Sequence, residues 1–146
     1  MDAKKTNEQI LEFGEKRMGS RLAPELIEQM AVEIRGYLIE KQLWIDTTIY
    51  FNGKAFSTND RKGHFAYNDP NDLIILENEN PRDYFEYVGP ILSMSFEGPL
   101  CDCINGYGEY ERSFEDKVVR ELRDIFEKYG CYYEQGHHWN LTLYRI

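Results

Sequence analysis

Reactive and metal-binding side chains gather in two short stretches of the second half of the sequence. The first is Cys101-Asp102-Cys103, the second is His137-His138, and Cys131 lies between them. Thiolates and imidazoles are ligands that zinc prefers, so these residue types suggest a metal site. Zinc sites usually place two or more residues between paired cysteines, and adjacent histidines in a strand point to opposite faces. The spacing therefore argues against zinc, and we expect no metal and no cofactor.

The same residues raise the question of a cysteine nucleophile. Such a nucleophile needs a histidine within hydrogen-bonding reach and a third group that orients the histidine. Nothing in the sequence brings Cys101 or Cys103 to His137 or His138, and free cysteine is among the residue types most often buried. We therefore expect the three cysteines to be free thiols packed in the interior, and we assign no catalytic residue.

The negative charge is confined to one part of the chain. The 146 residues carry a formal net charge of −9. Residues 1–68 hold 10 acidic and 10 basic residues, and residues 117–146 hold 4 and 5. Residues 69–116 hold 12 acidic residues but only two bases, Arg82 and Arg112, and so account for the whole imbalance. The acids are spaced out among tyrosines and phenylalanines, which predicts a folded acidic surface and not a disordered tail.

This acidic and aromatic segment is the candidate binding surface. Aromatic side chains anchor many protein interfaces, and exposed acids attract a basic partner. The residues expected to contact the partner are Asp83, Tyr84, Glu86, Tyr87, Asp102, Tyr107, Glu109, Tyr110 and Glu111. The simpler alternative is a solvated face that only confers solubility, or a structural subunit whose acidic face has no partner.

The composition also limits the class of partner. Nucleic-acid binding needs clustered lysine or arginine, and the chain has no basic run, so we expect no direct contact with nucleic acid. It has neither a long apolar segment nor a signal-like run in its first 30 residues, so we expect no membrane contact and a cytoplasmic location. The oligomeric state is not predicted.

An acidic, aromatic face can occupy a basic groove that normally holds nucleic acid, because duplex DNA presents about one negative charge per 1.7 Å. In charge and size the chain resembles the acidic inhibitors that phages and conjugative elements make against restriction and CRISPR systems. This resemblance to antirestriction and anti-CRISPR proteins is to a functional class, without a shared motif. We expect a non-catalytic inhibitor of a basic partner; the alternative is a small metal-dependent hydrolase or nuclease that uses Asp102, His137 and His138.

Helices are predicted in four places. A capping box at Thr6 and Gln9 predicts a first helix, so residues 1–22 are interpreted as an N-terminal helical arm. Pro24 suits the first position of a second helix, whose buried stripe is Ile27, Met30, Ala31, Ile34 and Leu38. A long helix capped by Ser113 and ended by Gly130 has the stripe Phe114, Val118, Leu122, Ile125, Phe126 and Tyr129. Asn80-Pro81 predicts a further short helix through about Tyr87.

Strands are predicted between and after these helices. Residues 44–51 and 54–58 form a β-hairpin around Asn52-Gly53. Residues 64–67 suggest a short strand, 73–76 a buried strand and 91–96 a strand with one face buried. Residues 100–111 are a glycine-rich loop with room for one helical turn, and 131–134 with 138–144 form a closing hairpin whose buried face is Trp139, Leu141 and Leu143. Because helices and strands are not strictly alternating, the sequence predicts a single α+β domain over residues 1–146, with an antiparallel or mixed sheet.

Overall fold

The structure, a computed structural model, describes residues 22–146. This part of the chain contains three α-helices and six strands. The helices are α2 (Pro24–Glu40), α3 (Pro99–Asn105) and α4 (Arg112–Lys128), with a short 3₁₀ helix, η1 (Pro81–Asp83). The strands are β1 (Thr47–Phe51), β2 (Lys54–Ser57), β3 (Ile74–Leu76), β4 (Leu92–Phe96), β5 (Cys131–Gln135) and β6 (Asn140–Arg145). The predicted α+β class is confirmed; the helix predicted to begin at Thr6 lies outside the described residues.

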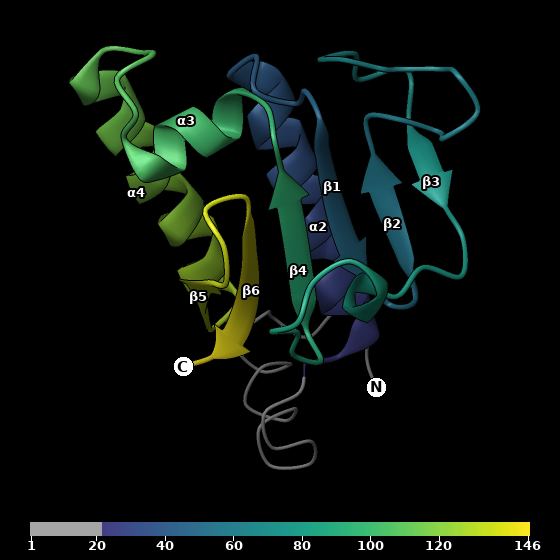
Figure 1. Cartoon of the computed structure of the whole chain (residues 1–146). Helices are drawn as coiled ribbons and strands as arrows, with labels where there is room; N and C mark the ends of the chain where they lie inside the picture. Colours follow the sequence, from purple (N-terminus) through teal and green to yellow (C-terminus); the bar gives the residue numbers. More distant parts are fainter. Residues whose placement is uncertain (1–21) are drawn as a thin grey trace.

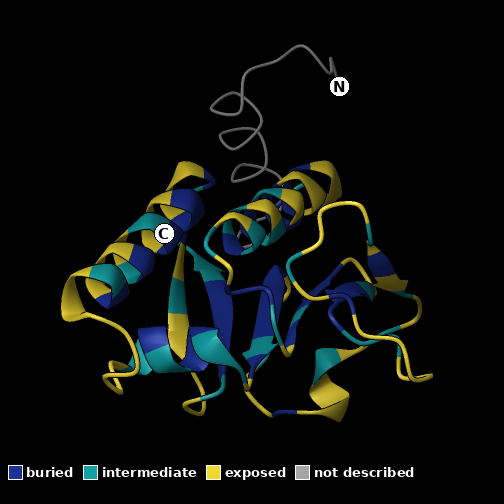
Figure 2. Ribbon diagram, turned by 90° about the horizontal axis from the view of Figure 1, so that it is seen from above, coloured by how far each residue is buried: buried dark blue, intermediate teal, exposed yellow. Residues whose placement is uncertain are grey.

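The six strands form one sheet in the order β3-β2-β1-β4-β6-β5, and every pairing is antiparallel (Figure 1). Helices α2 and α4 cover one face of the sheet and η1 lies on the other side, whereas α3 packs against α4 beyond the end of β4 (Figure 1 and Figure 2). None of the helices in residues 22–146 is long and apolar enough to cross a membrane.

The core lies between the sheet and its two long helices. Ile49, Met94 and Leu141 stand side by side on adjacent strands and are almost fully buried. The predicted stripe of α2 is buried along its whole length, and the stripe of α4 is buried except for Phe114, which is half-buried. A period of 3.6 residues in the sequence therefore located both helices correctly.

The opposite face of the sheet is built from small hydroxyl side chains. Ser93 lies beside Thr142, with their hydroxyl oxygens 2.9 Å apart, and Thr48 lies beside Ser57 at 3.1 Å. These pairs satisfy each other's hydrogen bonds and leave little apolar surface. A second, smaller hydrophobic cluster covers part of this face and contains Tyr50, Ala55 and Phe85, with Trp139 packed against it.

Several strand predictions need correction. The hairpin begins at Thr47 and not at Trp44, although Asn52 and Gly53 have the positive φ angles (49° and 76°) that its turn requires. Residues 64–67 form no strand, and only an isolated bridge joins Phe65 to Asn59. Strand β3 lies at the edge of the sheet with Ile75 43% exposed, so it is not buried. In β4 both faces are largely buried, because residues 79–90 cover the face that carries Ser93.

The helix termini and the closing strand also differ from prediction. The helix at Asn80-Pro81 stops at Asp83, and Ser113 lies inside α4, whose N-cap residue is Glu111. Residues 99–105 form the seven-residue helix α3, which is longer than the single helical turn predicted within this loop. Leu141 and Leu143 share the core face, but Trp139 precedes β6 and packs in the second cluster. Because Trp139 lies outside the strand, the alternation of side chains along β6 does not set its direction, and the indole packs on the opposite face of the sheet.

Candidate functional site

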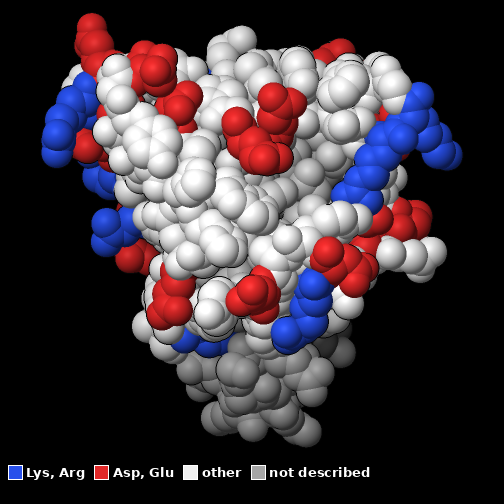
Figure 3. Space-filling view, viewed as in Figure 1, with Lys and Arg blue, Asp and Glu red and all other residues white. Residues whose placement is uncertain are grey.

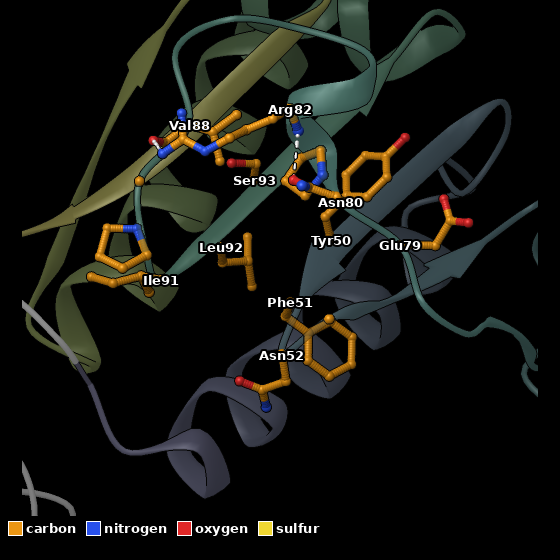
Figure 4. Close-up of a pocket in the computed structure, with 14 residues that line it drawn as sticks. Tyr50, Phe51, Asn52, Glu79, Asn80, Arg82, Val88, Ile91, Leu92 and Ser93 are labelled. Carbon is orange, nitrogen blue, oxygen red and sulfur yellow. Dashed lines mark hydrogen bonds between the residues drawn. The ribbon is translucent and has the colours of Figure 1, made fainter.

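Residues 79–90, here called the strap, cross the sheet face that α2 and α4 leave open. The Asn80 side chain accepts a hydrogen bond from the Arg82 backbone N–H, which caps η1. The Arg82 guanidinium then donates to the Val88 carbonyl at 3.0 Å and closes the strap on itself (Figure 4). The hydroxyl of Thr142 in β6 donates to the Tyr87 carbonyl at 2.7 Å. The strap is therefore tied both internally and to the sheet.

One aromatic side chain anchors the strap from below. Phe85 is 4% exposed and meets the rings of Tyr50 and Trp139 edge to face, at centroid distances of 5.8 Å in both cases. Edge-to-face contacts of this kind add to the gain from burying the ring itself. Phe85 thus fixes the backbone from which its exposed neighbours project.

We predict that Phe85→Leu loosens the strap without unfolding the domain. The change removes the two ring contacts and part of the buried surface, which we expect to lower the free energy of unfolding by about 1–2 kcal/mol. Thermal unfolding would measure this loss. Tyr87→Leu is the matched control: its ring is 63% exposed, so the loss should stay within about 0.5 kcal/mol. Equal losses in the two variants would contradict the anchoring role of Phe85.

The exposed residues of the strap differ in how freely they can meet a partner. Arg61 donates to the Tyr84 hydroxyl at 2.7 Å and pairs with Glu79 at 2.8 Å, which holds the half-exposed Tyr84 ring in place. Asp83, Glu86 and Tyr87 are exposed. Neither Asp83 nor Glu86 forms an ion pair within the described part of the chain. The strap therefore presents one fixed tyrosine, one free tyrosine and two unpaired acids.

The other predicted contact residues lie on α3 and the loop that joins it to α4. This loop turns at Gly106 and Gly108, whose φ angles of 65° and 84° suit glycine. The Gly108 N–H donates to the carboxylate of Glu115, which is only 5% exposed. Tyr110 packs on Phe114 at a centroid distance of 5.2 Å. A buried carboxylate and an aromatic pair thus order the loop.

The side chains at the surface of this loop are largely uncompensated. Tyr107 is 55% exposed and Tyr110 is 37% exposed, whereas Asp102 is half-buried. Glu109 and Glu111 are exposed, and neither they nor Asp102 form an ion pair with another residue of the 22–146 range. Partial burial, with the nearby acids, raises the pKa of Tyr110, so its hydroxyl is protonated and can donate a hydrogen bond.

The structure brings the predicted contact residues into two groups and not one. The strap precedes β4 and the α3–α4 loop follows it, so the groups lie toward opposite ends of that strand (Figure 1). On this face acidic side chains form several separate groups, one of them in the upper middle, and the area below that group carries few charges (Figure 3). A partner that touches both groups must therefore extend across the sheet.

The cysteines and histidines do not form a reactive site in the described residues. The Cys101 thiol and the Asn105 amide both donate to the backbone carbonyl of His138, at 3.4 and 2.7 Å, so α3 meets the β5–β6 turn without using an imidazole. The His137 ring stacks on Trp139 at 5.3 Å. Residues 22–146 contain no group of three or more His, Cys, Asp or Glu side chains that could hold a metal ion. Asp102, His137 and His138 thus share no metal-binding geometry.

All three cysteines are free and buried. Burial raises the pKa of the Cys101 thiol, that of Cys103 to about 12 and that of Cys131 to about 11. A thiol with a raised pKa carries little thiolate at neutral pH, and thiolate is the nucleophilic form.

We predict slow thiol chemistry in the folded protein. At pH 8, below the raised pKa values of Cys103 and Cys131, the native protein should react with a disulfide reagent far more slowly than the unfolded chain. The release of the chromophoric thiol in buffer and in denaturant would measure both rates. If one thiol reacted as fast in the native protein as in denaturant, that cysteine would be an accessible nucleophile, and the prediction would be wrong.

A cavity of about 480 Å³ opens between the strap and the β1–β2 turn. Figure 4 shows Phe51 and Leu92 along its apolar side, with Asn52 at one end and Arg82 across from it. Cysteine and histidine are absent from its lining. This cavity could not be predicted from local sequence patterns, because the strap and the hairpin that enclose it are about 30 residues apart in the chain.

The sequence also missed the residues that hold the strap. Arg61, Glu79 and Arg82 anchor it through charged side chains, but their partners depend on the tertiary fold. The only local signal was Asn80-Pro81, which correctly indicated the cap of η1. Comparisons with models of protein families, with curated proteins and with solved structures find no match to this chain.

Proposed function

We propose that this chain is a non-catalytic binding protein that engages, and inhibits, a basic nucleic-acid-binding protein. One observation carries the proposal: exposed acids without ion pairs stand beside exposed tyrosines on two well-anchored segments. These segments are the strap and the α3–α4 loop.

The helical side of the molecule carries both paired and unpaired acids. Glu33 pairs with Lys128, Glu28 with Lys54 and Glu121 with Lys41, whereas Glu25, Glu40, Asp124 and Glu127 are exposed and form no ion pair within residues 22–146. Unpaired acids leave a negative field that attracts basic partners and raises association rates, but neither α2 nor α4 contains an exposed aromatic ring. The strap and the α3–α4 loop combine unpaired acids with exposed tyrosines, which suits them to bind a cation-rich protein.

The tyrosines supply what charge alone does not. Tyr84, Tyr87, Tyr107 and Tyr110 each combine a large apolar ring with a hydroxyl that can form a hydrogen bond. Tyr84 is held by Arg61, and Tyr110 by Phe114, so binding costs these two rings little conformational entropy. Ordered aromatic residues of this kind slow dissociation.

The two acidic groups are separated by both β4 and α3, because the strap precedes β4 and the α3–α4 loop follows α3. Duplex DNA presents about one negative charge per 1.7 Å of its axis, so a groove that binds duplex carries cations along its length. A partner whose cationic groove extends across the sheet could therefore meet both acidic groups.

Affinity capture at low salt tests this function. The wild-type chain and a variant with Asp83→Asn, Glu86→Gln, Glu109→Gln and Glu111→Gln serve as bait, and duplex DNA or RNA serves as competitor. We expect a basic protein that the wild type captures, the variant loses and nucleic acid displaces. If both baits captured the same proteins, the four acids would not contribute to binding. If the variant lost a partner that neither nucleic acid displaces, the surface would bind a basic protein without taking the place of nucleic acid.

A further inference from the structure

The cavity between the strap and the β1–β2 turn lies where two neighbouring strands stop pairing (Figure 4). Strands β1 and β4 are paired as far as Tyr50 and Ser93. The same register would carry the pairing on to Asn52 and Ile91, but no backbone hydrogen bond joins these two residues. The two strands therefore separate at this end, and the cavity opens between them.

Two backbone groups face this gap. The Phe96 N–H donates to the residue before β6, and bonding alternates along an antiparallel strand, so the Leu92 N–H also points to β6. Because the C=O and N–H of one peptide group point in opposite directions, the Ile91 carbonyl faces β1. In the same way the Asn52 N–H faces β4, since the Phe51 carbonyl bonds within the β1–β2 hairpin. Neither group has a hydrogen-bond partner within residues 22–146.

The unpaired carbonyl is buried. Ile91 is 2% exposed, and buried backbone carbonyls are nearly always hydrogen-bonded. The turn on the other side of the gap is fixed, because the Asn52 side chain donates to the Pro24 carbonyl at 2.9 Å. A ligand that offers one donor to Ile91 and one acceptor to Asn52 would satisfy both groups. A single peptide amide carries such a donor and acceptor on opposite sides.

One uncompensated positive charge lies across the same cavity. The two charged side chains of its lining are Glu79 and Arg82. Glu79 is neutralised by Arg61 at 2.8 Å, whereas Arg82 forms no ion pair with a described residue. Arg82 donates to the Val88 carbonyl, and a guanidinium has five N–H donors. The remaining donors suit a carboxylate, which a guanidinium can bind at two points.

The deep side of the cavity is apolar. Its lining includes Phe51, Ile91 and Leu92, which are 2–3% exposed, and Val88 and Pro90 of the strap. The volume of about 480 Å³ lies within the range of sites that bind small ligands, which combine an apolar lining with a few polar groups. The cavity thus offers an apolar surface, an amide-sized gap and a cation.

We propose that this cavity binds the last residue of a peptide that ends in an apolar side chain. The amide of that residue donates to the Ile91 carbonyl and accepts from the Asn52 N–H. Its side chain packs on Phe51 and Leu92, and its carboxylate pairs with Arg82. A fatty acid lacks the amide donor, and an internal peptide residue lacks the carboxylate. The inference does not rest on the proposed function, because none of the nine predicted contact residues lines the cavity.

A titration of the isotope-labelled full chain with N-acetyl-leucine, followed by nuclear magnetic resonance, tests the site. The Asn52 amide resonance should shift and saturate. N-acetyl-leucinamide lacks the negative charge and should bind about tenfold more weakly, which corresponds to about 1.4 kcal/mol. The acetyl ester of the matching hydroxy acid has oxygen in place of the amide N–H and should also bind about tenfold more weakly.

Variants of Arg82 separate a direct contact from a change in the strap. Gln and Lys can both still donate to the Val88 carbonyl, so Arg82→Gln and Arg82→Lys differ chiefly in charge. Arg82→Gln should weaken N-acetyl-leucine by about tenfold and leave the binding of N-acetyl-leucinamide unchanged, whereas Arg82→Lys should keep most of the affinity for the acid. Arg120→Gln, an exposed position on α4, removes the same charge elsewhere and should bind the acid like the wild type.

An acetylated tetrapeptide, Ala-Ala-Ala-Leu, distinguishes a protein C-terminus from a free acylated amino acid. It should bind at least as tightly as N-acetyl-leucine, because the preceding residues leave through the open side of the cavity. Weaker binding of the tetrapeptide would overturn the peptide assignment. An Asn52 resonance that stays in place up to the solubility limit would overturn the site, and equal affinities for the acid and the amide would overturn the role of Arg82.

Discussion

A chain that lacks residues 139–146 is expected to be unfolded in buffer. The deletion removes β6, which lies between β4 and β5 and is the only described partner of β5. Leu141 and Leu143, at 1% and 0% exposure, leave the core with it. Losing one such leucine typically costs about 2–5 kcal/mol, against a total stability of about 5–15 kcal/mol for a domain.

The deletion also removes the cover of the opposite sheet face. Thr142 no longer holds the Tyr87 carbonyl, and Trp139 no longer packs on Phe85. Circular dichroism and thermal unfolding would measure the result. Removing only Ile146, which is 72% exposed, is the control and should leave a cooperative transition close to that of the intact chain. If the chain without residues 139–146 melted cooperatively near the melting temperature of the intact chain, the fold would not depend on β6 as we expect.

The second large effect is expected on association with the captured partner. Changing Asp83 to Asn and Glu86, Glu109 and Glu111 to Gln keeps side-chain size and removes four exposed negative charges. Electrostatic steering can raise association rates by about 10- to 1,000-fold, so we expect these changes to slow association by at least about tenfold at low salt. Stability should change little, because surface substitutions usually stay within about 0.5 kcal/mol. Stopped-flow or surface-binding kinetics would give both rate constants.

A matched control is available on the helical side of the molecule. Glu25, Glu40, Asp124 and Glu127 are exposed on α2 and α4 and form no ion pair within residues 22–146. Like the first set, this set consists of three glutamates and one aspartate. Their amide variants produce the same net charge but leave the strap and the α3–α4 loop intact. If this control slowed association as much as the first variant, total charge alone would explain the effect and the acidic surface would only confer solubility.

The sequence predicted best where the signal is local and repeated. The stripe from Ile27 to Leu38 located α2 because a helix with one buried face repeats every 3.6 residues, and Asn52-Gly53 located the first hairpin because its turn needs two positive φ angles. The exposure of Asp83, Glu86, Glu109 and Glu111 also followed from their types.

The sequence failed where long-range contacts decide the structure. Helix α3 is short and flanked by glycines, but Asn105 holds it against the β5–β6 turn. A Cβ on Gly98 would lie 2.5 Å from the Ile45 carbonyl oxygen, so this glycine permits the close approach that sets the start of α3. The division of the predicted contact residues into two groups follows from the predicted strand at residues 91–96, which lies between them, but the packing of Phe85 on Tyr50 and Trp139 could not be predicted, because strand order does not follow sequence order.

The salt dependence of the association rate with the captured partner tests the acidic binding surface most directly. The Debye length falls from about 10 Å at 0.1 M salt to about 3 Å at 1 M, which removes long-range attraction but leaves aromatic contacts. We predict that the wild-type rate constant falls steeply over this range and converges on that of the variant at Asp83, Glu86, Glu109 and Glu111. A wild-type rate constant that does not change with salt, or that stays above the variant's at 1 M by the same factor as at 0.1 M, would contradict it.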